Sequence, residues 1–260
     1  MAELLYEKDG PIATLTLNRP ERMNAISGPM LAALSERLVE ANADPDVRVV
    51  VITGAGRGFC AGLDLGDASS GTGIGGGAMP ATLDLRNAPP TVLHSLDKPV
   101  IAALNGGAAG YGMDLALGCD IRIAARRAKL AAAFTKRGVL PESGGTWLLP
   151  RLVGWSKAAE IIFTGRTLDS TQCLELGLVS QVVEDDALPG AARALANEIA
   201  ANAPLAVQGA KRMMRMALSE PFDDHVHHVY LQLLPLFQSA DFKEGVRSFL
   251  EKRDPKFQGR

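Results

Sequence analysis

The stretch KPVIAALNGGAAGYGMDLALGCDIRIAARRAKLAAAFTKRGVLPES, residues 98–143, decides the fold. An apolar run over residues 99–104 is typical of a buried strand, and a glycine-rich turn and a short helical segment follow it. A second apolar run, residues 120–124, predicts a neighbouring strand. The loop after it carries a single acidic residue, Glu142. We expect this stretch to form the floor and one wall of a binding site.

A second glycine turn, GFCAGLD at residues 58–64, follows another apolar strand, VRVVVIT at residues 47–53. The near-continuous apolar character of this strand is typical of a parallel sheet that is covered on both faces. We expect each glycine turn to leave a strand and to enter a helix. The sequence therefore predicts an α/β fold in which the second turn supplies the other wall of the site.

The flanking segments extend this α/β pattern. Residues 12–17 alternate as a strand does, and Ser27 is placed to cap a helix over residues 30–43. A helix over residues 82–96 is expected to be interrupted at the proline pair that begins with Pro89. Later elements are predicted as helices over 146–153, 156–163 (hinged near Gly154), 170–176, 188–203, 205–218 and 223–251, with one strand at 179–183. The chain thus begins with repeated strand–strand–helix units and ends in helices.

Bulk composition excludes several function classes. The 260 residues carry a formal net charge of −2 and are 47% hydrophobic, so we expect no surface for nucleic acid or for an anionic membrane. Three separate cysteines, without a CxxC pair, indicate buried thiols in a reducing compartment. The N-terminus lacks the pattern of a signal peptide, and no apolar window is continuous enough for a membrane span. We therefore predict a cytoplasmic protein.

Two further patterns are not expected to form sites. Residues 67–79 are rich in glycine and include a formal GxGxxG at 71–76, but no strand precedes that motif and no clear helix start follows it. We interpret the segment as a flexible loop. His225, His227 and His228 lack a cysteine or carboxylate at recognisable ligand spacing, so no metal site is predicted.

The two glycine turns suggest a shared function. The first N–H groups of a helix have no internal partner and lie at its positive end. Two such donors aimed at one oxygen would stabilise an enolate formed from a carbonyl compound. The candidates are the amides of Ala61, between Cys60 and Gly62, and of Tyr111, which follows Gly110. Spacing alone leaves open that these are ordinary turns after buried strands.

Several ordered motifs resemble the enoyl-CoA hydratase/isomerase (crotonase) superfamily. They are LNRP at 17–20 with MNA at 23–25, GFCAGLD at 58–64, KPVIAALNG at 98–106 and CDIRIA at 119–124. Two later segments, GVLPESGGTWLLPRLVG at 138–154 and DFKEGVRSFL at 241–250, are similar to the branch of phenylacetate-pathway ring-opening enoyl-CoA isomerases. The resemblance runs from about Leu4 to the last residue.

The resemblance implies a crotonase-like spiral of repeated ββα units with a C-terminal helical region, assembled as trimers or dimers of trimers. It implies a core over residues 1–200 that holds the CoA-thioester site and a helical trimerisation region over residues 201–260. The substrate is expected to be an acyl-CoA thioester, with no separate cofactor, whose carbonyl accepts from the Ala61 and Tyr111 amides. The residues implied to contact CoA or substrate are Arg22, Ala25, Cys60, Gly62, Leu63, Asp64, Gly110 and Phe134.

The acidic residues depart from the pattern of the family's hydratases, which use two glutamates. This chain has Asp114 at the first of these positions and Phe134 at the second. Its acid is Glu142, directly after Pro141, where the ring-opening isomerase branch places a single working carboxylate. One carboxylate suffices to move a double bond, because it can remove a proton and return it to another carbon. Glu142 is therefore the expected base, with capping of the next helix as the alternative.

The role of Asp114 stays open. It could position a water or share a proton with Glu142, which would restore hydration, or it could only complement the helix dipole. The sequence favours an enoyl-CoA isomerase that acts through Glu142. The alternatives are an enoyl-CoA hydratase that uses Asp114 and Glu142, and a non-catalytic acyl-CoA-binding protein on the same scaffold.

Overall fold

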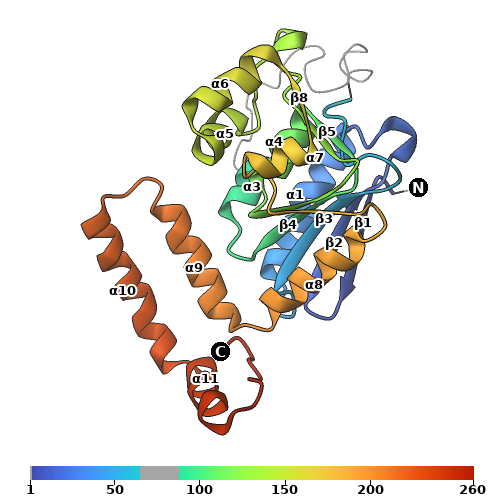
Figure 1. The fold of residues 1–260 in the computed structure, drawn as a ribbon. Coiled ribbons are helices and arrows are strands. Elements are labelled where there is room, and N and C mark those ends of the chain that lie inside the picture. The colour runs from blue at the N-terminus through green and yellow to red at the C-terminus, as the bar shows by residue number, and fades with distance from the viewer. Residues whose placement is uncertain (1, 65–87) are drawn as a thin grey trace.

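A six-stranded sheet forms the centre of the protein (Figure 1). The computed structural model describes residues 2–64 and 88–260. The strand order is β1-β2-β3-β4-β6-β9, in which β1 and β2 pair antiparallel and the later neighbours pair in parallel. The strands are β1 (Leu4–Asp9), β2 (Ile12–Leu17), β3 (Val49–Gly54), β4 (Val100–Leu104), β6 (Ile121–Ala125) and β9 (Gln181–Val183). The predicted strands are confirmed, and β1, a largely exposed edge strand, is an addition.

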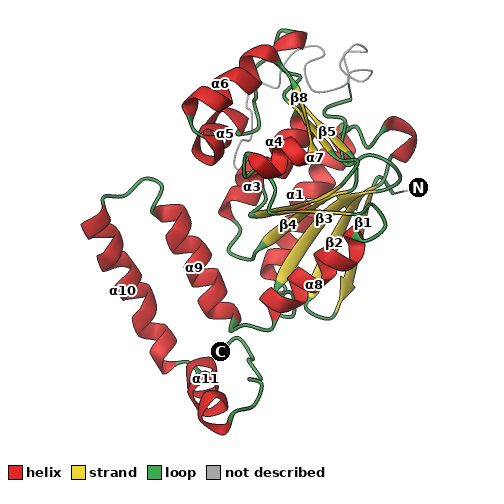
Figure 2. Ribbon diagram, viewed as in Figure 1, coloured by secondary structure: helices red, strands yellow, loops and turns green. Residues whose placement is uncertain are grey.

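The large sheet is covered on both faces, as the apolar run in β3 predicts. Val50 and Ile52 point to one face and join a core with the buried side of α1 (Gly28–Ala43). Val49 and Val51 point to the other face, where they pack against α8 (Leu188–Ala200). Figure 2 shows α1 and α8 on opposite sides of the yellow strands. Alternate residues of one strand therefore serve two cores.

A second sheet of three short strands lies beside the glycine turns. It has the order β5-β7-β8, with β5 parallel to β7 and β7 antiparallel to β8. The strands are β5 (Gly107–Ala109), β7 (Lys129–Ala131) and β8 (Thr167–Asp169). Each has three residues, which is too short for an alternating pattern to show in the sequence. This sheet was not predicted, and it occupies part of what was interpreted as a loop.

Helix boundaries follow local signals. The Ser27 hydroxyl accepts a hydrogen bond from the Met30 amide at 3.1 Å, so the predicted cap of α1 is confirmed. Gly154 both ends α5 (Gly145–Val153) and begins α6 (Trp155–Thr164), as predicted. The remaining elements of this part are η1 (Pro20–Arg22), α3 (Pro89–Ser95), α4 (Tyr111–Gly118), η2 (Thr135–Arg137) and α7 (Ser170–Glu175).

Pro89 begins α3 rather than interrupting a longer helix. Proline lacks the N–H that an interior helical position donates, so it suits the first turn. The earlier part of the predicted helix 82–96 lies outside the described residues. So do the predicted loop 67–79, with its GxGxxG, and the helix expected after the first glycine turn.

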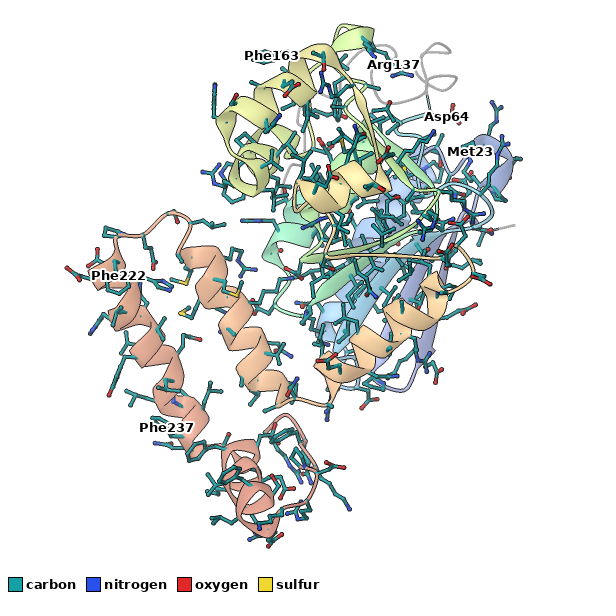
Figure 3. All side chains as sticks on the ribbon, in the orientation of Figure 1. Met23, Asp64, Arg137, Phe163, Phe222 and Phe237 are labelled. Carbon is teal, nitrogen blue, oxygen red and sulfur yellow. The ribbon has the colours of Figure 1, made fainter. Side chains whose placement is uncertain are left out.

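The C-terminal helices form an arm that extends away from both sheets (Figures 1 and 3). The arm consists of α9 (Pro204–Met216), α10 (Phe222–Gln238) and α11 (Ala240–Glu251). The predicted helix 223–251 is thus two helices, because Ser239 ends α10 and its hydroxyl caps α11 by accepting from the Phe242 amide at 3.0 Å. Within residues 2–64 and 88–260, no helix is long and apolar enough to cross a membrane.

Close backbone contact joins the two glycine turns. The Ala109 amide of β5 donates to the Cys60 carbonyl at 2.9 Å, and the Cys60 amide donates to the Gly107 carbonyl at 3.1 Å. A Cβ atom on Gly112 would stand 2.2 Å from the Cys60 carbonyl oxygen, well inside van der Waals contact. Glycine at position 112 therefore allows α4 to pack against the first turn.

Gly112→Ala is expected to lower the free energy of unfolding by about 2–3 kcal/mol, because the added methyl group forces α4 away from Cys60. Gly107→Ala is the matched control, since a Cβ atom there meets nothing within 4 Å. Urea unfolding of both variants, followed by circular dichroism, measures the difference. Equal stability of the two variants would contradict the close contact.

Candidate active site

A cavity of about 520 Å³ lies between α3, α4 and the start of α5. Its lining includes Leu93, His94, Tyr111, Asp114, Glu142 and Trp147. The two acids that the sequence singled out come from segments about thirty residues apart, and the fold brings them to the same cavity. The second glycine turn borders this cavity through Tyr111, the first residue of α4.

The amide of Ala61 is not available to a ligand. It donates to the Met23 carbonyl at 3.0 Å. The amide of Leu63, two residues later, has no hydrogen-bond partner among the described residues. Leu63 pairs with Ile26 as a parallel β-bridge, in which the bonds to Ile26 come from the residues on either side of Leu63. Its own N–H therefore points away from Ile26, and Leu63 replaces Ala61 as the candidate donor.

The amide of Tyr111 also has no partner among the described residues, as expected for the first N–H of a helix. The turn before it is held in place, since the Gly110 amide donates to the Ala131 carbonyl at 3.0 Å. Gly62 has a φ of +103°, and a Cβ atom there would stand 3.6 Å from the Tyr111 nitrogen. Gly62 thus leaves open the space beside this amide.

Glu142 lies on the loop before α5 and is an exposed residue that lines the cavity. Partial burial against the cavity walls raises its pKa above the ordinary value, because loss of water disfavours the charged form. The alternative role as a helix cap is not observed. Gly144 occupies the N-cap position of α5, and α5 has no side-chain cap from its own N-cap residue.

Asp114 instead bonds to the amides at the start of α5. Its Oδ2 atom accepts from the Ser143 and Gly145 amides, both at 3.2 Å. The side chain is buried, and burial raises the pKa of Asp114 to about 7 although these two N–H groups lower it; the charge of Glu142 adds to the increase. Asp114 therefore fastens the loop that carries Glu142 to α4. Neither role considered from the sequence included this contact.

The residues expected to contact CoA lie on loops near the first turn. Arg22 is exposed at the end of η1. The Ala25 carbonyl and the Asp64 carboxylate both bind Arg19, whose Nη1 donates to Ala25 at 2.8 Å and whose Nη2 lies 3.0 Å from Asp64. Arg19 was not singled out in the sequence. Its position within the LNRP motif could have drawn attention to it. Its partners could not be identified from the sequence, because they lie up to 45 residues away along the chain.

Cys60 and Phe134 do not offer side chains to a ligand. Cys60 is fully buried, and burial raises the pKa of its thiol to about 12. Phe134 is buried behind the second turn, with its Cε1 atom 3.9 Å from where a Cβ atom on Gly110 would stand. Neither residue lines the cavity that contains Glu142. The expected contact of these two residues with CoA or substrate stays a prediction, and their buried side chains support the turns from within the core.

Trp147 and His94 both line the cavity, and the contact between their rings is a feature that the sequence did not reveal. Their ring centroids are 5.3 Å apart in an edge-to-face arrangement. The Arg151 guanidinium lies 3.9 Å from the centroid of the Trp147 ring. The pattern of residues 146–153 predicts a helix, but it does not show that Trp147 on this helix contacts His94 on α3.

The raised pKa of Asp114 predicts a specific pH dependence of stability. The carboxyl group is protonated more readily in the folded protein, at about 7, than at its ordinary value of 3.8. Protonation of Asp114 therefore stabilises the folded protein. This stabilisation is fully present below about pH 4 and is lost as the pH rises to about 7. Asp114→Asn removes the titration and keeps one oxygen for the two amides.

Between pH 4 and pH 8, the difference in unfolding free energy is therefore expected to shift in favour of Asp114→Asn by on the order of 3 kcal/mol. Urea unfolding of both proteins across this range measures the shift. Curves for the variant and the native sequence that stay parallel would contradict a raised pKa.

Comparison with known proteins identifies the family. The family model described as Enoyl-CoA hydratase/isomerase matches residues 7–260. The chain is 41% identical over 263 residues to the 1,2-epoxyphenylacetyl-CoA isomerase of Escherichia coli (strain K12), with 100% of both chains covered. It is 38% identical to the (E)-benzylidenesuccinyl-CoA hydratase of Thauera aromatica, over 97% of this chain and 98% of that one.

Solved structures agree with this assignment. The crystal structure of enoyl-CoA hydratase from Bacillus anthracis matches with a TM-score of 0.91 at 33% sequence identity, over 100% of both chains. The strand–helix units and the C-terminal helices are thus those of the crotonase fold. The chain belongs to the enoyl-CoA hydratase/isomerase (crotonase) family and is an acyl-CoA enzyme of the isomerase or hydratase type.

Proposed function

We propose that the protein is an enoyl-CoA isomerase in which Glu142 moves a proton between two carbons of the acyl group. The observation that carries the proposal is the state of Glu142. It lines the cavity, its pKa is raised, and it makes no ion pair with any described residue. A carboxylate that is partly shielded from water and free of a cation is a stronger base than an ordinary surface glutamate.

The substrate carbonyl is proposed to accept from the Leu63 and Tyr111 amides. These two N–H groups have no partner among the described residues, and the second lies at the positive end of α4. Glu142 removes a proton from C2 of a 3-enoyl thioester, and the negative charge moves to the thioester oxygen. The amides stabilise that dienolate, and the same carboxyl group returns the proton at C4.

Asp114 is proposed to act on Glu142 through the backbone. By accepting from the Ser143 and Gly145 amides it fixes the loop directly after Glu142. The substrate is proposed to be a 3-enoyl-CoA or a ring-derived CoA thioester. The similarity of this chain to a 1,2-epoxyphenylacetyl-CoA isomerase supports the ring-derived thioester.

Hydration of a 2-enoyl-CoA is the second candidate. It is favoured by the presence of two carboxyl groups, Asp114 and Glu142, with raised pKa values at one cavity. One could hold a water while the other supplies the proton, as in a two-acid mechanism. Similarity to the Thauera aromatica hydratase also supports it. A third interpretation, binding of acyl-CoA without turnover, gains no support from an acid with this environment.

Glu142→Gln is expected to lower the rate of 3-enoyl-CoA isomerisation by about a thousandfold or more, because glutamine has the same size but cannot accept the proton. The assay follows the absorbance of the conjugated enoyl thioester. Glu198→Gln, on the exposed side of α8, is the control and should keep the native rate. Isomerisation that survives in Glu142→Gln would refute the proposed base.

A parallel assay with a 2-enoyl-CoA separates the candidates. A fall in absorbance that needs both Asp114 and Glu142 would support hydration instead. Tight binding of acyl-CoA with no change in either assay would support the binding protein.

We also propose that the arm, within residues 201–260, forms the interface of a homotrimer or of a dimer of trimers. Apolar side chains of the arm that are exposed in the single chain include Phe222, Tyr230, Leu231, Leu234, Phe249 and Leu250. So many large apolar groups on an element that leaves the core are typical of an interface. Figure 3 shows Phe222 and Phe237 on this arm, far from Phe163 on α6.

Sedimentation velocity is expected to give a mass of three or six copies of the 27.4 kDa chain. Tyr230→Glu and Phe249→Glu, which place a charge on the arm, are expected to yield smaller species. Phe163→Glu is the control, because Phe163 is equally exposed but lies outside the arm. A native protein that sediments as a monomer would contradict the proposed interface.

A further inference from the structure

Arg215, near the end of α9 in the arm, binds the backbone at the end of α3. Its Nη1 atom donates to the His94 carbonyl at 2.9 Å and to the Leu96 carbonyl at 3.1 Å. Its Nη2 atom donates to Asp97 Oδ1 at 3.2 Å. One guanidinium group therefore connects the arm to the segment in which α3 ends.

The carbonyls at the end of α3 need a partner from outside the helix. The last carbonyl groups of a helix have no N–H partner within it, and they lie at its negative end. With only seven residues, α3 is also shorter than an isolated helix must be to persist in water. A cation with several N–H donors suits this end on both counts. A residue of the arm thus holds the C-terminal end of α3.

The same helix supplies part of the wall of the cavity that contains Glu142. Leu93 and His94 line it. Leu93 also packs closely on α4, since a Cβ atom on Gly118 would stand 2.9 Å from its Cδ2 atom. The His94 ring meets the Trp147 ring edge-on. A movement of α3 would therefore change the shape of the cavity, while the acid comes from a different segment.

Arg212, one helical turn before Arg215, provides an internal comparison. It donates through Nη2 to Asp97 Oδ2 at 2.5 Å and through Nη1 to Gln232 of α10 at 2.8 Å. Although burial raises the pKa of Asp97, the bonds from Arg212 and Arg215 hold it below its ordinary value, so the carboxylate stays charged. Among the described residues, Arg212 makes no hydrogen bond to a carbonyl of α3. The two arginines share a charged partner, but only Arg215 binds the backbone of the cavity wall.

We propose that Arg215 is a positioning residue that holds the α3 wall and thereby sets the affinity of the cavity for the acyl group of a CoA thioester. The arm then contributes to acyl recognition through α3. Methylene groups that lie against Leu93 and Trp147 gain from a fixed wall, because dispersion attraction depends on close packing. The inference rests on the proposed function in one respect, since it places the acyl group in the Glu142 cavity.

The test is equilibrium binding of two saturated thioesters, acetyl-CoA and hexanoyl-CoA, measured by isothermal titration calorimetry. The probes share CoA and differ only in the length of the acyl chain. We expect the native protein to prefer hexanoyl-CoA, because its additional methylene groups leave water. Arg215→Met keeps an unbranched side chain but removes the donors. It is expected to weaken binding of hexanoyl-CoA about tenfold and of acetyl-CoA less than about twofold.

Arg212→Met is the matched control. It removes the same type of side chain from the same helix and from the same partner, Asp97, but leaves the α3 carbonyls bound. Both affinities are expected to stay within about twofold of the native values, because a partly exposed ion pair contributes little. Circular dichroism and sedimentation velocity check that both variants keep the native fold and assembly.

Arg215→Lys decides the question if Arg215→Met does not fold. Lysine keeps the charge beside Asp97, but its single nitrogen cannot occupy the positions of both Nη1 and Nη2. The selective loss of affinity for hexanoyl-CoA is expected in this variant as well, and the same outcomes decide it.

Four results would overturn the proposal. They are no preference for hexanoyl-CoA in the native protein, unchanged binding of hexanoyl-CoA in the Arg215 variant, an equal loss for both thioesters, and an equal loss in Arg212→Met. The measurement needs no turnover and is therefore separable from the proposed base. Native isomerase activity in Glu142→Gln, together with a selective loss in the Arg215 variant, would count against the proposed function alone.

Discussion

The contact between Cys60 and β5 is the constraint on which the rest of the site depends. It holds the first glycine turn against the segment that enters α4, and it does so through backbone hydrogen bonds at 2.9 and 3.1 Å. Without a Cβ atom at Gly112, the helix approaches the Cys60 carbonyl closely. The proposal that the Leu63 and Tyr111 amides bind one oxygen depends on this contact, which brings the two backbone segments together. Glycine costs conformational entropy here, and the buried strands β3 and β4 on either side offset that cost.

Helix α4 also fixes the acid relative to these donors. Its first residue, Tyr111, presents an amide, and three residues later Asp114 accepts from the loop that follows Glu142. One helical turn therefore relates the proposed oxyanion donor, the Tyr111 amide, to the loop of the proposed base, Glu142. Burial of Asp114 is unfavourable for its charged form, which is why its pKa rises to about 7. The hydrogen bonds from the Ser143 and Gly145 amides partly compensate for this loss of hydration. Asp114 can therefore hold the loop of Glu142 in place without contacting substrate.

The sequence predicted those features that depend on local patterns. Apolar runs gave β3 and β4, and the Ser27 cap and the break at Gly154 were readable from residue type and position. The sequence did not predict features that depend on backbone pairing between residues far apart along the chain. Whether Ala61 or Leu63 offers its N–H depends on distant backbone partners. The Ala61 amide donates to the Met23 carbonyl, whereas the bridge to Ile26 leaves the Leu63 N–H unused. Cys60 stands in a matching motif and Phe134 at a departure from the hydratase pattern, but only the packed core shows that both side chains are buried and do not line the cavity.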